Sequence, residues 1–444
     1  MFFETEKNKM ERALLIFLRF KQDEFLKDNL VVAPQKFEFD EGIEELKNLA
    51  ISAGAEVAHT IIHSQEKPNP KFYISTGKLD EIRQIVEDDN IDIVIFDNEI
   101  TPAQQSNLQD KLKVKVIDRT ALILDIFAQR AQSKEGKLQV ELAQLNYILP
   151  RLRGKGTELS RLGGGIGTRG PGEQKLEVDR RKIRERINLL DKKLEEISIQ
   201  RKVQRKLREQ KGVYKISIVG YTNSGKSTLL NALTNANVLE RDMLFSTLDS
   251  TTRKLDLDTG IKISISDTVG FIEKLPHQLI AAFRSTLEEV VKADLLLLLV
   301  DLSNYNYEKH ILSVKKVLEE LKIQDKKILL VFNKIDKITD DIITNASLKY
   351  RDSVFISAKT NKGLEDLIDT IQEIISSDHV NFTATIPYSE SSFESKIYEN
   401  CDVIRKKYLD DYIKIKASCN LQIYEKLLHY VKNNHEKVRL QRTR

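Results

Sequence analysis

Residues 220–227 read Gly-Tyr-Thr-Asn-Ser-Gly-Lys-Ser, and they lie between an apolar run, Val213–Val219, and a helical pattern over Thr228–Thr234. A GxxxxGK[ST] pattern in this strand–loop–helix context is typical of a loop that holds phosphate groups with backbone N–H groups. Lys226 is expected to contact the β- and γ-phosphates, and Ser227 to give an oxygen ligand to Mg²⁺. This feature restricts the surrounding chain to an α/β fold with a mostly parallel sheet.

A second motif follows another apolar run. Asp267-Thr-Val-Gly270 stands at the end of Ile261–Ser266. An aspartate at this strand end can hold Mg²⁺ through water, and the Gly270 N–H can contact the γ-phosphate. Many strands end in aspartate, so the motif gains its weight from its place after the phosphate-binding loop.

Two short motifs predict that the base of the bound nucleotide is guanine. Asn333-Lys-Ile-Asp336 ends the run Ile328–Phe332, and Ser357-Ala-Lys359 follows the next predicted strand. Asp336 can accept hydrogen bonds from N1–H and the 2-amino group of guanine, and adenine offers no such pair. We expect Asn333 to brace the loop, Lys334 to pack on the base, and the Ser357-Ala-Lys359 backbone to cover O6. Use of ATP as well remains open.

The segment Phe245-Ser-Thr-Leu-Asp249 lies between the first two motifs and is expected to close over the bound nucleotide. One threonine in this region should reach Mg²⁺ when GTP is bound. Thr247 is our choice, with Thr251 and Thr252 as alternatives.

The position after Gly270 lacks a residue that many GTPases use. A glutamine there orients the attacking water, whereas this chain has Phe271 and then Ile272, which cannot hydrogen-bond to water. We therefore expect slow hydrolysis by the isolated protein and stimulation by a partner. Gln278 is a weak substitute, because we expect it on the following helix.

The predicted site residues fall into three groups. Catalytic roles are assigned to Lys226, Thr247 and Gly270. Ligands of Mg²⁺ are Ser227, Thr247 and, through water, Asp267. The residues that we expect to bind the substrate GTP are Gly220, Tyr221, Thr222, Asn223, Ser224, Gly225, Lys226, Ser227, Phe245, Ser246, Thr247, Leu248, Asp249, Asp267, Thr268, Val269, Gly270, Asn333, Lys334, Ile335, Asp336, Ser357, Ala358 and Lys359.

The chain has 444 residues, too many for one hydrophobic core. Residues 1–132 alternate strand and helix patterns and predict a small α/β domain. Residues 212–377 repeat that alternation around the phosphate-binding loop, with helices expected on both faces of the sheet. Residues 378–444 predict a smaller α/β domain, with helices near Glu390–Asn400 and Leu421–Val431, strands near Val403–Lys407 and Tyr412–Ala417, and a basic tail, Lys437–Arg444, that we expect to fray.

Between the first two of these domains, residues 133–211 predict a basic antiparallel helical hairpin, with helices near 137–149 and 174–208. Its second helix carries apolar residues at a period of 3.5, and the loop at 163–172 is dense in glycine. From Lys175 to Lys211 there are 14 Lys or Arg against 7 Asp or Glu. A basic hairpin with a glycine loop favours contact with RNA, and Arg151, Arg153, Arg161 and Arg169 are the candidate contacts.

The amino-acid composition indicates the kind of cellular compartment in which we expect the protein. Two cysteines, Cys401 and Cys419, are too few for a disulfide framework, although the two could pair with each other. We expect them at buried core positions in a reducing compartment. We find neither a signal peptide nor a run long enough to span a membrane. We expect a cytoplasmic monomer without stable membrane insertion, although peripheral membrane association remains open.

These motifs together resemble one known family. The stretch Gly163-Gly-Gly-Ile-Gly-Thr-Arg-Gly-Pro-Gly-Glu173, followed by a basic helix and a domain with Phe245-Ser-Thr-Leu-Asp249 and Asp267-Thr-Val-Gly-Phe271, is similar to the HflX family of ribosome-associated GTPases. The resemblance covers about residues 11–376. Ser246 departs from it, because alanine is frequent there, and a hydrophobic residue at position 271 agrees with it.

The resemblance implies binding to the large ribosomal subunit and its rRNA, dissociation of stalled or idle ribosomes under heat stress, and hydrolysis stimulated by ribosomes. The alternative is a nucleotide-sensing regulatory protein that acts on another protein, such as a membrane protease, with incidental hydrolysis. An RNA-modifying GTPase has no support, because no additional catalytic cysteine or cofactor motif is present.

Overall fold

The computed structural model describes residues 10–20, 35–152, 171–209, 213–234, 245, 251–255, 257, 263–272, 288–321, 323, 326–434 and 437–442. The chain forms two compact units. The first consists of Met1–Glu196, Arg241–Asp249 and Glu273–Arg284. The second consists of Ile197–Glu240, Ser250–Ile272 and Ser285–Arg444.

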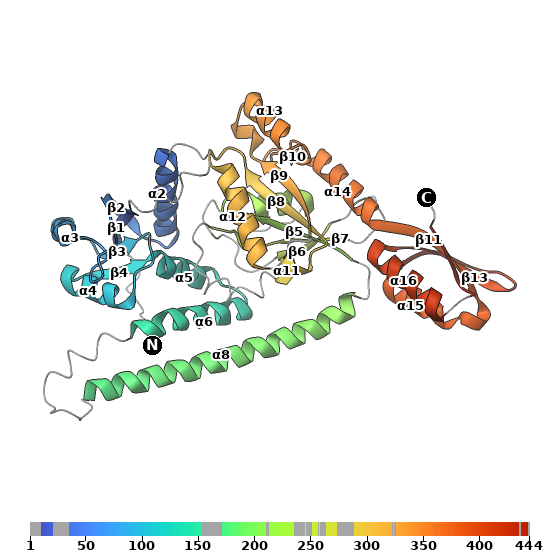
Figure 1. Cartoon of the computed structure of the whole chain (residues 1–444), viewed down its shortest axis with the longest axis horizontal. Coiled ribbons are helices and arrows are strands. Elements are labelled where there is room, and N and C mark those ends of the chain that lie inside the picture. Colours follow the sequence, from blue (N-terminus) through green and yellow to red (C-terminus); the bar gives the residue numbers. More distant parts are fainter. Residues whose placement is uncertain are drawn as a thin grey trace. The chain divides into compact units, whose positions relative to one another are not determined.

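The N-terminal domain is a parallel four-stranded sheet with the strand order β2-β1-β3-β4, drawn in blue in Figure 1. Its elements are β1 (Arg12–Phe20), α2 (Gln35–Ser52), β2 (Glu56–Gln65), α3 (Thr76–Asp88), β3 (Ile93–Phe96), α4 (Pro102–Leu112), β4 (Lys115–Asp118) and α5 (Arg119–Arg130). The alternation of strands and helices confirms the predicted α/β class. Apolar strands pack against helix faces, as the periodicity requires.

Buried charges fix the carboxyl end of this sheet. Asp118 is fully buried and accepts hydrogen bonds from the Tyr147 hydroxyl (2.9 Å) and the Arg151 guanidinium (3.0 Å). Burial raises the pKa of Tyr147, so it stays a protonated donor. Arg119 pairs with both Asp97 (2.9 Å) and Glu45 (2.7 Å). The helix that carries Tyr147 and Arg151 is thereby fastened to the domain.

That helix, α6 (Lys134–Arg151), packs on α5 and also lies beside α8 (Pro171–Glu209), as Figure 1 shows. The Arg186 guanidinium of α8 makes two hydrogen bonds, 2.7 and 3.0 Å long, to the Glu141 carboxylate of α6. The apolar seam residues of α8, of which Leu190 is fully buried, are less exposed than their charged neighbours. The 3.5-residue period therefore marks the covered side of α8, as predicted.

The domain that carries the phosphate-binding loop has a six-stranded sheet in the order β10-β9-β8-β5-β7-β6. Its strands are β5 (Tyr214–Gly220), β6 (Thr251–Leu255), β7 (Ile263–Asp267), β8 (Leu295–Asp301), β9 (Lys327–Asn333) and β10 (Ser353–Phe355), and β6 pairs antiparallel with β7 while the other pairs are parallel. Its helices are α9 (Lys226–Thr234), α11 (Glu288–Lys292), α12 (Tyr307–Glu320), the 3₁₀ turn η1 (Ile335–Lys337), α13 (Asp340–Lys349) and α14 (Leu364–Asp378).

Two apolar clusters lie on the two faces of this sheet. One contains side chains of α9 and α14, and the other contains side chains of α11, α12 and α13. Both faces of the sheet are therefore covered, which explains the almost unbroken apolar run of β8. Because parallel strands end at the same edge, Gly220, Asp267, Asp301 and Asn333 all come to one side of the domain.

The C-terminal domain is an antiparallel four-stranded sheet with the order β12-β13-β11-β14. Its elements are β11 (His379–Pro387), the 3₁₀ turn η2 (Tyr388–Glu390), α15 (Ser392–Asn400), β12 (Asp402–Tyr408), β13 (Tyr412–Asn420), α16 (Leu421–Asn434) and β14 (Arg439–Arg442). The chain order is βαββαβ, which with this strand order is the ferredoxin-like topology. The predicted strands and helices of this region are confirmed.

Two features of this domain differ from the sequence prediction. β11 was not predicted, although Phe382, Ala384 and Ile386 alternate inward along it. The prediction that the tail Lys437–Arg444 frays is wrong for Arg439–Arg442, because these residues form β14 and pair with β11. The tail has too few apolar residues to show a strand pattern, and its structure comes from pairing with a neighbour that is distant in the sequence.

Cys401 and Cys419 form no disulfide and are buried in the core of the C-terminal domain, as predicted. Among the helices that the structure describes, none combines the length and the apolar character that a membrane span requires.

Candidate active site

The phosphate-binding loop begins at the end of β5, the strand between β8 and β7, and runs into α9. Gly225 has a φ of +92°, and a Cβ atom there would lie 2.4 Å from the Asn333 side-chain nitrogen. Glycine is therefore needed both for its backbone conformation and for its small size. The hydroxyls of Thr222 and Ser224 are buried without a hydrogen-bond partner among the described residues, as expected of a loop shaped for a polar ligand.

Lys226 is buried and folded across its own loop. Its ammonium donates to the carbonyl oxygens of Tyr221 (2.9 Å) and Gly220 (3.3 Å). Burial lowers the pKa of Lys226 to about 8, opposed by the charge of Asp267. Phosphate oxygens near this ammonium would favour its charged form, so the predicted role of Lys226 suits its position.

Ser227 and Asp267 come together at the start of α9 and the end of β7. The Ser227 hydroxyl donates to the Asp267 carboxylate at 2.6 Å. Hard oxygen donors of this kind suit Mg²⁺, which in nucleotide sites takes one or two protein oxygens and completes its shell with phosphates and water. Within the described ranges, no group of three or more His, Cys, Asp or Glu is arranged to hold a metal ion.

The segment after Asp267 is held against the phosphate-binding loop. The Phe271 N–H donates to the Gly220 carbonyl (3.1 Å), and the Thr222 N–H donates to the Phe271 carbonyl (2.7 Å). A Cβ atom at Gly270 would lie 2.9 Å from the Thr222 methyl group and 3.0 Å from the Lys226 ammonium. Gly270 therefore lies next to the lysine that the sequence assigned to the γ-phosphate.

Thr268 and Val269 complete this motif with buried side chains, and the Thr268 hydroxyl donates to the Ile218 carbonyl at 2.7 Å. The Phe271 side chain enters the apolar cluster under α12, and Ile272 is buried as well. Neither residue presents a polar group where an attacking water would need one.

Asn333 connects three loops. Its side-chain N–H₂ donates to the Ser224 carbonyl (2.8 Å), and its side-chain oxygen accepts from the Ala358 N–H (2.9 Å). The residue is buried, so these bonds fix the distance between the phosphate-binding loop and the Ser357-Ala-Lys359 loop. The bracing role predicted for Asn333 is what the contacts describe.

Asp336 is exposed and held in one orientation. Its carboxylate accepts from the buried Ser357 hydroxyl at 2.6 Å, and this hydrogen bond lowers the pKa of Asp336. Lys359 adds a weaker favourable charge. The carboxylate is therefore ionised at neutral pH and available to guanine. Ile335 differs from its neighbours, because its side chain is buried in the protein.

Lys334 has a partner that the sequence did not reveal. Its ammonium pairs with Asp301 at the end of β8 (2.7 Å) and donates to the Asn223 carbonyl (2.8 Å). A second unpredicted contact stacks the Tyr221 ring on His310 of α12, with centroids 3.8 Å apart. Asp301 could have been suspected as the polar end of an apolar strand, whereas His310 has no sequence signal.

Apart from Arg151, three of the remaining predicted residues are described and the others fall outside the described part of the chain. Phe245 belongs to the first compact unit, where its buried ring packs on Phe127 at a centroid distance of 4.6 Å. Thr251 and Thr252 lie in β6, with Thr251 opposite Asp267. Ser246, Thr247, Leu248, Asp249, Gln278, Arg153, Arg161 and Arg169 fall outside the described residues.

Arg151, proposed from sequence as an RNA contact, is engaged within the N-terminal domain. Its guanidinium donates to Asp118, Gln105 and the carbonyls of Ile100 and Tyr147, and it lies 3.4 Å from the Tyr147 ring centroid. These contacts give Arg151 a structural role that fastens the end of α6.

The chain is similar to known proteins from residue 40 to residue 334. Three family models match in succession: a GTP-binding GTPase N-terminal region at residues 40–128, a GTP-binding GTPase middle region at 130–208, and a 50S ribosome-binding GTPase domain at 215–334. A GTP-binding protein of Sulfolobus solfataricus in complex with GDP is 30% identical, with a TM-score of 0.41, over 83% of this chain and 99% of that one.

Curated relatives span nearly the whole chain. The GTPase HflX of Caldanaerobacter subterraneus is 46% identical over 89% of this chain and 91% of its own length. The GTPase HflX of Escherichia coli is 40% identical over 93% of each. With the nucleotide site described above, these matches show that the chain is a P-loop GTPase that belongs to the HflX family, whose GTPase domain is of the 50S ribosome-binding type.

Proposed function

We propose that this protein binds the large ribosomal subunit and dissociates stalled or idle ribosomes under stress, with GTP binding and hydrolysis controlling its attachment. Hydrolysis of GTP to GDP and phosphate is slow in the isolated protein and is stimulated by ribosomes. The observation that carries this proposal is the pairing of an assembled guanine nucleotide site with a buried Phe271 at the position where many GTPases place glutamine.

Different residues of the site have different roles in the hydrolysis of GTP. Lys226 neutralises charge that develops between the β- and γ-phosphates, and Gly270 donates its N–H to the γ-phosphate. Ser227 and Asp267, which already lie within 2.6 Å of each other, would hold Mg²⁺, with Thr247 as a further ligand when GTP is bound. Bound there, Mg²⁺ would supply positive charge that offsets the charge of the phosphates.

Orientation of the attacking water is the missing function. Phe271 and Ile272 bury their side chains, and Phe271 is also held by two backbone hydrogen bonds. Rotating either residue toward the nucleotide would not supply a hydrogen-bonding group. A partner must therefore complete the site, and a ribosome-binding GTPase has a natural candidate in the ribosome itself.

The basic hairpin, residues 133–211, supports contact with rRNA. The sequence of this segment has an excess of Lys and Arg, whereas the described side chains of α8, residues 177–200, include six exposed Lys or Arg and five exposed Asp or Glu, and its apolar seam is turned to the protein. Arg153, Arg161 and Arg169 stay candidate RNA contacts. Arg151 does not, because its hydrogen bonds are made within the N-terminal domain.

The decisive experiment measures the GTP hydrolysis rate of the full chain with and without purified large subunits. Strong stimulation supports the proposal, and an unchanged rate contradicts it. Sedimentation through a sucrose gradient with a non-hydrolysable GTP analogue provides a second readout. Absence of co-migration with the large subunit at low salt would favour the alternative, a nucleotide-sensing regulatory protein with incidental hydrolysis.

A charge-reversal variant at Arg153, Arg161 and Arg169 tests the hairpin. Ribosome stimulation should be lost while GTP affinity stays unchanged, since none of the three belongs to the nucleotide site. If stimulation survives the reversal, the contact lies on another part of the protein.

A further inference from the structure

The C-terminal sheet has one covered face and one open face. Along β11 and β13, alternate residues such as Phe382, Ala384, Ile413 and Ile415 are buried against α15 and α16. Figure 1 shows these two helices on the same side of the sheet. The residues between them along each strand point to the other side, which no described helix covers.

Strand register places eight residues of the open face in two rows of four. Residues directly opposite each other in neighbouring strands share a face. The first row is Arg405, Lys416, Thr383 and Gln441, and the second is Lys407, Lys414, Thr385 and Arg439. We call these eight residues the basic sheet face.

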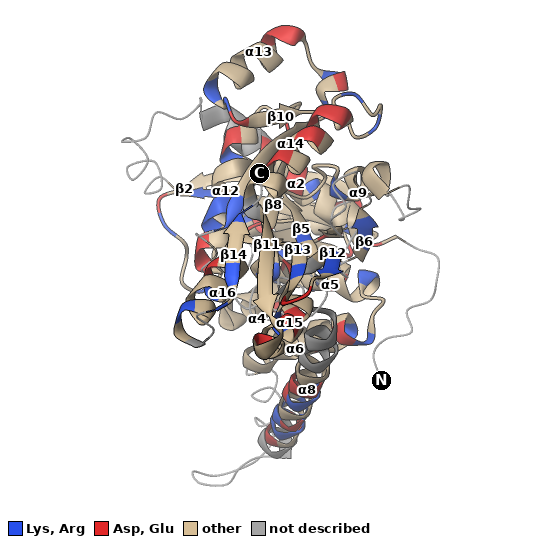
Figure 2. Cartoon of the chain, turned by 90° about the vertical axis from the view of Figure 1, so that its right-hand side faces the viewer, with Lys and Arg blue, Asp and Glu red and all other residues tan. Residues whose placement is uncertain are grey.

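The charge on this face has one sign. Five of its residues are Lys or Arg, all of them exposed, and none of the five forms an ion pair with another described residue. Figure 2 looks toward this domain and shows basic residues on β12, β13 and β14. The next row along the sheet adds one acidic position, since Asp402 of β12 is opposite Ser418 of β13.

Pairs of cations lie directly opposite each other in β12 and β13. Arg405 is opposite Lys416, and Lys407 is opposite Lys414. Like charges directly opposite in an antiparallel pair are destabilising, so this arrangement works against the stability of the isolated sheet. An anionic partner lying over both rows would remove that repulsion.

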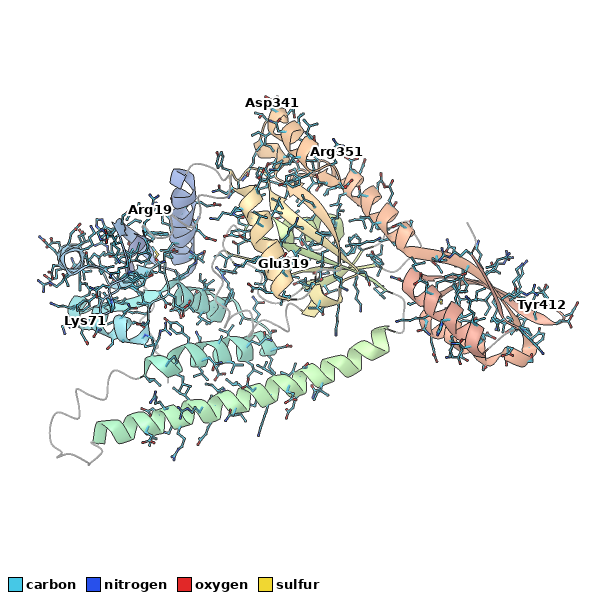
Figure 3. The ribbon with its side chains drawn as sticks, in the orientation of Figure 1. Arg19, Lys71, Glu319, Asp341, Arg351 and Tyr412 are labelled. Carbon is cyan, nitrogen blue, oxygen red and sulfur yellow. The ribbon has the colours of Figure 1, made fainter. Side chains whose placement is uncertain are left out.

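The remaining residues favour a nucleic acid over an acidic protein surface. Thr383, Thr385 and Gln441 provide hydroxyl and amide groups among the cations, which suits phosphate and 2′-hydroxyl groups. Tyr412 follows on the same face of β13, at the end of the β12–β13 hairpin (Figure 3), and is 36% exposed, so a base can stack on it. An open four-stranded βαββαβ sheet is also a known platform for single-stranded RNA.

We propose that the basic sheet face binds single-stranded RNA, chiefly through its phosphate backbone. The two central strands carry Lys and Thr at mid-sheet positions where sequence-reading domains of this topology carry aromatic residues. Recognition should therefore be tolerant of base sequence and strongly dependent on salt. The inference goes beyond GTP hydrolysis and ribosome dissociation, and it rests on neither.

The test measures binding of a short fluorescein-labelled oligouridylate to the full chain by fluorescence anisotropy over a series of KCl concentrations. The variant is Lys414→Glu/Lys416→Glu, and we expect affinity to fall by at least about tenfold. The slope of log K against log salt should become shallower by about 1.4, since each phosphate contact to a single strand contributes about 0.7.

The chain offers a matched control. Lys426 and Lys432 are exposed on α16, on the helical side of the same domain, so Lys426→Glu/Lys432→Glu makes the same change in charge elsewhere. RNA affinity should fall much less in the control. Both variants keep the nucleotide site intact, so GTP affinity should not change.

Unfolding of the variant would not give the expected combination of lower RNA affinity and an unchanged or higher melting temperature. The double reversal on β13 puts a carboxylate opposite each of Lys407 and Arg405, which replaces repulsion by attraction. The melting temperature should therefore stay the same or rise while RNA affinity falls. A variant that loses RNA binding together with its melting temperature would not support the proposal.

Photo-cross-linking separates this face from the basic hairpin, which also carries many cations. After irradiation with a 4-thiouridine oligonucleotide, mass spectrometry should find RNA attached to the peptide that contains Tyr412. Cross-links confined to residues 133–211, equal weakening in both variants, or equally strong competition by polyglutamate would each overturn the proposal. Ribosome-stimulated hydrolysis, measured in parallel, shows independently whether the proposed function holds.

Discussion

The nucleotide site and the basic sheet face both use lysines, but they hold them in opposite ways. In the nucleotide site, Lys226 is buried on backbone carbonyls of its own loop, and Lys334 is held by Asp301 and the Asn223 carbonyl. On the sheet face, Lys414 and Lys416 are exposed and opposed by other cations. The first arrangement fixes cations in advance for one small ligand, whereas the second leaves them free to follow an extended polyanion.

The largest effect is expected for the Asp336 carboxylate. It tests how much the base selectivity of the nucleotide site depends on this one group. Asp336→Asn replaces an acceptor with a group that donates to the 2-carbonyl of xanthine and no longer pairs with the guanine amino group. We expect the preference for GTP over XTP to change by about 10⁴-fold or more, because a site with unpaired polar groups rejects the wrong base strongly. Competition binding with both nucleotides measures it, and an unchanged preference would remove Asp336 from base recognition.

Gly225→Ala tests the packing of the same site. The new methyl group would meet the Asn333 side chain at 2.4 Å in a left-handed backbone conformation, so GTP affinity should fall by about 100-fold. Gly54→Ala is the control, because Gly54 has a φ of +93° with no atom within 4 Å of the added group. Isothermal titration calorimetry compares the two variants: Gly54→Ala lies outside the nucleotide site and should keep its GTP affinity, and equal affinities would contradict this account.

Arg151→Gln tests whether Arg151 of the N-terminal domain is held by contacts that stabilise the fold, as the lysines of the nucleotide site are held by theirs, or is dispensable for stability, as we expect of the cations of the sheet face. It leaves the buried Asp118 without its ionic partner, so unfolding free energy should fall by about 3–5 kcal/mol. Arg186→Gln breaks an exposed pair with Glu141 and should cost less than about 1 kcal/mol. Urea denaturation compares them. Similar values would show that burial does not distinguish the two arginines.

The smallest effect is a pH dependence of the fixed lysine. Between about 8, the pKa of Lys226 in the nucleotide-free fold, and its usual 10.5, the unfolded chain holds a proton that the folded chain lacks. Stability of the nucleotide-free protein therefore rises with pH through this window. Phosphate binding needs the ammonium and takes up the proton, so GDP affinity should fall about fourfold between pH of about 7 and about 8.5.

Calorimetry in two buffers of different ionisation enthalpy should detect this proton uptake. Guanosine is the control, because without phosphates it does not need the Lys226 charge. Equal pH dependence for GDP and guanosine would assign the effect to another group.

Sequence patterns predicted the order of strands and helices in the first two α/β domains because their strands are apolar and their helices amphipathic. The motif residues could be placed for a related reason: glycines at Gly220 and Gly225 and the polar residues Asp267 and Asn333 stand at strand ends, where a parallel sheet brings them together. Their mutual bonds, such as Asn333 to Ser224, follow from that convergence.

Apart from β11, whose alternation of buried residues was missed, the failures have a common cause. β14, the Asp301–Lys334 pair and the Tyr221–His310 stack all depend on residues far apart in the sequence, and none has a local pattern. For Arg151, the local pattern was present but misleading. A basic residue beside a basic segment suggests a surface role, whereas the contacts of Arg151 are with the domain interior. The basic sheet face was also hidden, because its cations come from three strands with different neighbours.

The last residue of α14, Asp378, is followed directly by the first residue of β11, His379. No linker separates the helix of the GTPase domain from the sheet that carries the basic face. In terms of multivalent binding, the effective concentration of this face near an RNA held against the GTPase domain is therefore set by the α14–β11 junction and not by the length of a tether. A flexible Gly-Ser insertion at this junction would change that concentration without altering a single contact residue.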